Sequence, residues 1–162
     1  YDPLRLIDIF DTYSDFGLPI HLSEVSIPSW SNEPEDEEIQ AELVERLVRL
    51  WFSRKNVEAA IWWNLVDGTA YGDENRFHAG LLRNDMTTKP AYEVLDRLIN
   101  HEWHTEYETG NADRVIFEGF YGDYEITFTH DGKKYTRKAH LFRDTTGYDN
   151  RLADYRTTRV EI

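Results

Sequence analysis

The stretch GLPIHLSEVSIPSW, residues 17–30, is an apolar run that contains a single carboxylate, Glu24. The segment 18–27 has the length and composition of a buried strand. A buried strand has no structural use for an unpaired acid, because removing a charge from water is costly. We therefore expect Glu24 to have either a chemical role or a structural one, in which it pairs with an arginine or caps the following loop.

Helices and strands alternate on both sides of this stretch. Asp2 followed by Pro3 is typical of a helix start, and apolar residues continue at helical spacing as far as Tyr13. Further along the chain, the pattern predicts an amphipathic helix of about five turns around residues 39–51, a near-continuous apolar strand at 57–65 and a helix at 89–101. Apolar strands that alternate with helices predict parallel strands buried on both faces, so the first 100 or so residues are expected to be α/β.

The pattern changes after Trp103 to short segments of alternating polar and apolar residues. YEITFTH (124–130) and KYTRKAHLF (134–142) flank Asp131-Gly132, a strong hairpin-turn signal. With WHTEYET (103–109) and RVIFEGF (114–120), they predict a small antiparallel β-sandwich of about four strands. An irregular tail follows, in which 156–162 has strand character. We therefore expect one domain at 1–102 and a second, all-β domain at 103–162.

The composition excludes several classes of protein. Hydrophobic residues make up 40% and aromatic residues 14% of the 162, which indicates a globular chain. The net charge of −13 disfavours nucleic acid and anionic membranes as partners, and the absence of Cys excludes disulfide and thiolate chemistry. His101 and His104 lack an acidic partner pattern, so we expect structural roles for them and neither a metal nor a cofactor. The sequence lacks an initial Met and opens on a helix signal, so we expect it to be cut from a longer chain.

A cluster of aromatic and polar residues follows the second expected strand. In parallel α/β architectures, active sites form at the carboxyl ends of strands, where Glu24 falls. The segment IWWNLVDG (61–68) places Trp62, Trp63, Asn64 and Asp67 at that same end. An aromatic platform beside hydrogen-bonding groups suits a sugar ring. The alternative is core packing, which at least one of the two adjacent Trp side chains should adopt, because neighbours on a strand point to opposite faces.

Three segments together resemble a known family. DIFDTYSDFGLPIHLSEVSI (8–27), IWWNLVDG (61–68) and AGLLRNDMTTKPAYEVLDRLI (79–99) are similar, in this order, to the carboxyl-terminal part of glycoside hydrolase family 10, the endo-β-1,4-xylanase family. The resemblance implies that residues 1–102 hold the last strands and helices of a (β/α)8 TIM barrel, to which the small antiparallel β-sandwich is appended. It implies that Glu24 is the nucleophile of a retaining glycosidase, and it matches Trp63 and Asp67 to residues of the family's last strand.

The sequence also departs from the family pattern. Ser26 stands where the family has Asp, Asn64 where it has Gly, and Tyr71 where a loop Trp is expected. These changes put xylan in doubt more than glycosidase chemistry. The alternative is a non-catalytic, carbohydrate-binding or structural remnant of a glycosidase.

The resemblance carries further expectations about partners and location. It implies that the acid/base glutamate lies upstream of residue 1, so the isolated chain is expected to be inactive. Carbohydrate is the expected ligand, and no cofactor is needed. Two strands of a barrel leave an apolar face open, which the remainder of the barrel or another copy of the chain is expected to cover. The family further implies an extracellular or cell-envelope location.

Overall fold

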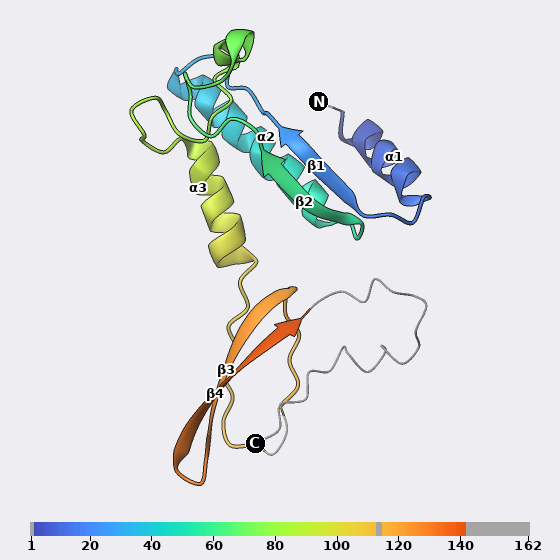
Figure 1. Cartoon of the computed structure of the whole chain (residues 1–162), viewed down its shortest axis with the longest axis vertical. Coiled ribbons are helices and arrows are strands. Elements are labelled where there is room, and N and C mark those ends of the chain that lie inside the picture. The colour runs from blue at the N-terminus through green and yellow to red at the C-terminus, as the bar shows by residue number, and fades with distance from the viewer. Residues whose placement is uncertain (1, 113–114, 142–162) are drawn as a thin grey trace. The chain divides into compact units, whose positions relative to one another are not determined.

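A computed structural model describes residues 2–112 and 115–141 (Figure 1). The chain divides into two compact units, of which the first ends at Glu102 and the second begins at Trp103. The first unit contains helices and a parallel pair of strands, and the second contains an antiparallel hairpin. The described part of the chain is therefore a small α/β structure with two small sheets.

The first unit has the element order that the sequence predicts. Its elements are α1 (Pro3–Ser14), β1 (Ile20–Val25), α2 (Pro34–Phe52), β2 (Val57–Trp62), the short 3-10 helix η1 (Gly72–Phe77), α3 (Pro90–Asp96) and the π-helical η2 (Arg97–Glu102). The helix expected at 89–101 is thus α-helical only as far as Asp96. The strand expected at 57–65 is shorter, because it ends at Trp62.

Local signals explain where the first two helices begin. The Asp2 side chain accepts hydrogen bonds from the backbone N–H groups of Leu4 and Arg5, and so caps α1. Pro34 opens α2, and acidic residues fill its first turn, where they interact favourably with the helix dipole. None of the described helices is long and apolar enough to cross a membrane.

The two strands of the first unit are parallel, as predicted. Leu22 pairs with Ala60 and Val25 with Trp62, and the register shifts between these two pairs. A buried cluster that includes Val25 and Val44 lies between the strands and α2, and Leu22 and Trp62 pack against it. Figure 1 shows α2 running alongside β1 and β2.

The expectation that both faces of these strands are buried is wrong for the described residues. Ile61 and Trp63 alternate with the core residue Trp62 and are each 52% exposed. No other strand within 2–112 and 115–141 extends the pair β1–β2, so a TIM barrel is not shown. The face opposite α2 is open because no layer of the described chain covers it.

Among the described residues of the second unit, 103–112 and 115–141, the structure contains one hairpin in place of the predicted sandwich. β3 (Gly122–His130) and β4 (Lys133–Leu141) pair antiparallel along their whole length, around the predicted turn at Asp131-Gly132. Both turn residues have positive φ, 48° and 75°, as a type I′ turn requires. The predicted strand character of 156–162 lies outside the described residues.

Segments 103–112 and 115–120 form no strand, which corrects the four-strand prediction. Their aromatic side chains pack against one another and against the hairpin, but their backbones do not join a ladder. Tyr107 stacks on Phe117 at 5.8 Å, and Phe117 contacts Tyr124 of β3 at 5.6 Å. The Tyr124 hydroxyl donates to the backbone oxygen of Phe120 at 2.6 Å. Alternating hydrophobicity therefore identified the packing residues of these segments and not their backbone conformation.

Candidate functional site

The candidate site lies at the carboxyl ends of β1 and β2. Glu24 is the penultimate residue of β1, and Trp63 directly follows β2. The backbone N–H of Trp63 donates to the carbonyl oxygen of Val25 at 3.0 Å, so the two strand ends are adjacent. The structure therefore brings the segments that carry Glu24 and Trp63 to one end of the parallel pair.

Glu24 is exposed, which corrects the premise that its carboxylate is buried in a strand. The register irregularity between Leu22 and Val25 leaves Ser23 and Glu24 between two core residues, and both are exposed. Within residues 2–112 and 115–141, the Glu24 carboxylate makes no hydrogen bond or ion pair. Among these residues, Glu24 neither pairs with an arginine nor caps the loop, and its side chain is exposed.

The two adjacent tryptophans have different environments. Trp62 packs against the core, and its indole N–H donates to the backbone oxygens of Asn64 at 3.1 Å and Ala79 at 3.0 Å. Trp63 is half exposed. The expectation that one of the pair packs inside is thus met by Trp62, and Trp63 presents its ring to solvent.

Asn64 and Tyr71 lie in the segment that connects β2 to η1. The Asn64 side-chain amide donates to the Glu74 carboxylate at 3.1 Å. Tyr71 immediately precedes η1 and is 94% exposed. Both residues are accessible, and their contacts with a sugar stay a prediction.

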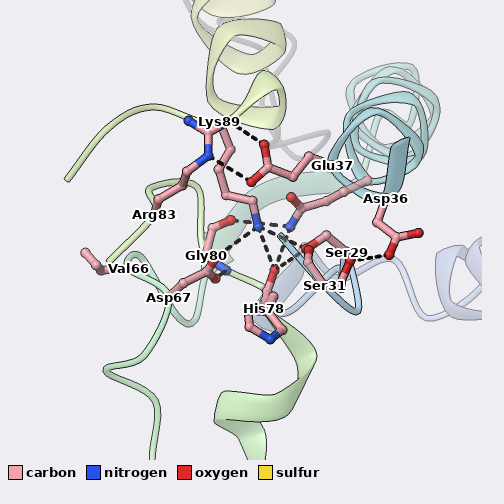
Figure 2. A network of polar contacts seen from close by, with 12 residues as sticks. Ser29, Ser31, Asp36, Glu37, Val66, Asp67, His78, Gly80, Arg83 and Lys89 are labelled. Carbon is pink, nitrogen blue, oxygen red and sulfur yellow. Dashed lines mark hydrogen bonds and ion pairs between the residues drawn. The ribbon is translucent and has the colours of Figure 1, made fainter. Parts of the chain in front are cut away.

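Asp67 is buried in a polar network that was not predicted from the sequence (Figure 2). Its carboxylate accepts from the backbone N–H of Gly80 at 2.8 Å and from the Lys89 ammonium at 3.1 Å. Lys89 is completely buried and also donates to the Ser29 hydroxyl at 3.1 Å and to the carbonyl oxygen of His78 at 2.7 Å. Asp67 therefore has structural partners here, and its role in sugar binding stays a prediction.

Gly80 is required at its place in this network. A Cβ at this position would lie 2.6 Å from the backbone nitrogen of Asp67 and 2.8 Å from its carboxylate oxygen. Because such a contact is far inside van der Waals distance, any larger residue would displace Asp67. The glycine thus permits the close approach of the segments that carry Asp67 and Gly80.

Helix α2 contributes two more buried polar side chains next to this network. The Gln40 amide donates to the backbone oxygens of Ile27 at 2.7 Å and Gly80 at 3.3 Å. Glu37 is 2% exposed and pairs with Arg83, whose Nε donates at 2.9 Å. This hydrogen bond raises the pKa of Arg83 above its usual range. The loops after β1 and β2 are therefore fixed to each other and to α2.

The site thus combines a buried polar network with accessible side chains at the carboxyl ends of β1 and β2. Lys89 and Ser29 were not among the predicted site residues, because a lysine before a proline is an ordinary helix start and its burial needs tertiary contacts. Within the described residues, no group of three or more His, Asp or Glu could hold a metal ion. The accessible groups include the Glu24 carboxylate and the rings of Trp63 and Tyr71, and such a combination suits a neutral polyhydroxyl ligand.

No family model matches the chain, and its similarities to known proteins are partial. The chain is 31% identical over 134 residues to the anti-sigma-I factor RsgI6 of Acetivibrio thermocellus, covering 78% of this chain and 17% of that protein. The structure of a family 39 glycoside hydrolase from Bacteroides cellulosilyticus WH2 matches 77% of this chain and 24% of its own, at 17% identity and a TM-score of 0.40.

The chain therefore spans less than a fifth of the curated relative that it matches. The solved structure is a glycoside hydrolase, but of family 39. Neither match supports the resemblance to family 10 or a specificity for xylan.

Proposed function

We propose that the first unit contributes the nucleophile and part of the sugar-binding surface of a retaining glycoside hydrolase that cleaves a β-linked, xylan-like polysaccharide. The observation that carries this proposal is the exposed carboxylate of Glu24, which has no partner in the described chain and lies at the strand ends beside an exposed tryptophan. An unpaired, accessible carboxylate can approach an anomeric carbon directly.

The chemistry requires a second carboxyl group. In retaining glycosidases, one carboxylate attacks the anomeric carbon while a carboxylic acid about 5–5.5 Å away protonates the departing oxygen. Water then hydrolyses the glycosyl-enzyme ester, and the second group acts as base. In this proposal Glu24 forms the ester, and the acid/base residue lies N-terminal to residue 1 in a longer protein.

The other predicted residues divide into two roles. Trp63, Asn64 and Tyr71 contact the sugar, since their side chains are at least partly exposed. Trp62 and Asp67 hold the surface in shape, because Trp62 packs in the core and Asp67 is bound to Lys89. The strand face that carries Ile61 is covered by the remainder of a barrel or by another copy of the chain, and Trp63, beyond the end of β2, stays accessible to the sugar.

The test is Glu24→Gln in the complete gene product, assayed on xylohexaose and cellohexaose. Because the amide cannot form the ester, we expect kcat to fall by about 10³-fold or more while binding is largely preserved. The control is Glu38→Gln, which changes an exposed carboxylate on α2 and should leave turnover unaltered. Unchanged turnover in Glu24→Gln would rule out the nucleophile role.

A second candidate is carbohydrate binding without cleavage. The exposed ring of Trp63 favours it, because an aromatic ring can hold a sugar without any covalent step, and the 31% identical relative is named an anti-sigma-I factor. This candidate predicts that calorimetry detects oligosaccharide binding by the unmodified protein while no reducing ends are released. Measurable hydrolysis that depends on Glu24 would exclude it.

A further inference from the structure

Trp30, in the loop after β1, is exposed in an unusual backbone conformation. The residue is 65% exposed, and its φ is +70°. A bulky side chain rarely adopts this left-handed region, because its Cβ crowds the backbone. Such strain persists only where the surrounding structure imposes it, and it often marks a functional position.

The Trp30 ring is supported from one direction and otherwise accessible. It meets Phe77 at 5.3 Å between ring centroids with an interplanar angle of 89°. Perpendicular rings cannot stack face to face, so together with the exposure of Trp30 this geometry leaves indole surface open to a ligand. The guanidinium of Arg76 lies 5.2 Å from the centre of the Phe77 ring and adds a cation–π contact to the support.

The buried network holds the backbone on which Trp30 sits. The Trp30 N–H donates to the carbonyl oxygen of Phe77 at 3.1 Å, and the Ser29 N–H donates to that of His78 at 3.4 Å. The Ser29 hydroxyl donates to the same His78 oxygen at 2.9 Å and accepts from the buried Lys89 ammonium at 3.1 Å. Figure 2 shows Ser29, His78 and Lys89 converging. The hydrogen bonds that Ser29 makes with His78 and Lys89 thus fix the backbone position of Trp30, the next residue in the chain.

We propose that Trp30 is a further sugar-binding residue, on which one pyranose ring of the same β-linked oligosaccharide stacks, and that Lys89 positions it. This inference rests on the proposed carbohydrate function and extends its surface to the loop after β1. A fixed indole suits a sugar because its apolar face packs against ring C–H groups and loses little conformational freedom on binding. A sugar is neutral, so it also avoids the repulsion that this acidic chain would exert on an anionic ligand.

The test is calorimetric titration of the complete gene product with xylohexaose and cellohexaose, in a Glu24→Gln background to suppress turnover. Trp30→Gly removes the ring, and glycine adopts positive φ without strain. We expect its Kd for the bound hexasaccharide to rise by roughly two- to tenfold or more. Trp30→Phe retains an aromatic face and should recover part of the affinity.

Two comparisons separate the possible results. Phe16 is an aromatic residue that is 70% exposed and precedes β1, at the end of the strand opposite to Glu24. Phe16→Ala should therefore not change the Kd. If Trp30→Gly binds as tightly as its parent while Trp63→Ala binds more weakly, this inference is overturned and the proposed function stands. If the parent binds neither hexasaccharide, the proposed function fails, and this inference fails with it. Circular dichroism verifies that each variant is folded.

Discussion

At the scale of single residues, Lys89 is the most constrained side chain of the first unit. Its ammonium has three N–H donors and is matched to three acceptors, the Asp67 carboxylate, the Ser29 hydroxyl and the His78 carbonyl oxygen. A buried ion pair is by itself weak evidence of stabilisation, because desolvation offsets much of the attraction. Removing one partner is different, since it leaves the other charge buried and unpaired.

Lys89→Met is therefore expected to destabilise the fold strongly. The substitution leaves Asp67 buried without its counter-charge and should lower the free energy of unfolding by about 3–5 kcal/mol. Urea unfolding measures the change. The double variant Lys89→Met, Asp67→Leu should recover part of the loss, because it removes both charges.

The matched control for that experiment is Lys55→Met. Lys55 is exposed just after α2, and replacing it should change the stability little. If Lys55→Met and Lys89→Met lowered the free energy of unfolding equally, the structural role of the buried network would be contradicted.

Glu24 and Lys89 show what can and cannot be predicted from the sequence at a single position. Glu24 could be singled out because it is the lone acid in an apolar run. Its exposure could not be predicted, because the run does not reveal whether a second layer covers its outer face. Lys89 was missed for the converse reason, since a lysine is normally exposed and its burial depends on residues distant in sequence.

At the scale of elements, α2 and η2 are joined by a cluster of four charged residues. Arg49 of α2 contacts Glu45 at 2.9 Å and also pairs with Glu102 of η2. Arg97 contacts Glu45 at 2.9 Å and Glu102 at 3.1 Å. Hydrogen bonds from Arg97 and Arg49 lower the pKa of Glu45, and the hydrogen bond from Arg49 lowers the pKa of Glu102.

This cluster predicts a pH dependence of stability. Because folding lowers both pKa values below 4.5, the cluster stabilises the fold above about pH 4.5, and that contribution is lost as the pH falls through the folded-state values. The melting temperature should therefore drop as the pH falls below about 4.5. This drop in melting temperature should be modest, and smaller at high salt, because the four charged side chains are partly exposed.

The variant that tests this assignment is Glu45→Gln, Glu102→Gln. Its melting temperature should depend less steeply on pH than that of the parent. A control with Glu38→Gln, which changes an exposed carboxylate outside the cluster, should keep the parent slope. An identical slope in the cluster variant and the parent would show that other carboxylates control the acid transition.

Elements with local signals were predictable, and those that depend on remote contacts were not. The Asp2 cap defines α1, and Asp131-Gly132 defines the hairpin, because each signal acts within a few residues. The prediction of sandwich strands was wrong for 103–109 and 115–120, because alternation there reflects ring packing such as Tyr107 on Phe117. The π-helical η2 has no signal in the sequence that we can identify.

At the scale of the whole molecule, the open face of β1 and β2 is the feature to be explained. Ile61 lies on the face opposite α2, and Leu65, beyond the end of β2, is also apolar; both are more than half exposed. Soluble proteins rarely leave such a patch beside unpaired strand edges, because both promote association. The proposed cover is the remainder of a barrel or another copy of the chain.

Residues 1–162 alone are therefore expected to self-associate. Sedimentation velocity should detect species larger than the 19.2 kDa monomer, and Ile61→Lys should reduce their amount by placing a charge in the patch. Ile39→Lys is the control, because Ile39 is 55% exposed on α2 and should not affect association. A monodisperse monomer that unfolds cooperatively would contradict this expectation.

Covalent labelling of the protein tests directly whether Glu24 attacks a sugar. The complete gene product is incubated with an activated 2-fluoro-xyloside or 2-fluoro-glucoside, and the product is analysed by intact-mass spectrometry and peptide mapping. The proposal predicts a covalent adduct on Glu24, which also identifies the sugar. Absence of an adduct with both reagents, in a protein that still binds xylo-oligosaccharides, would contradict the nucleophile role.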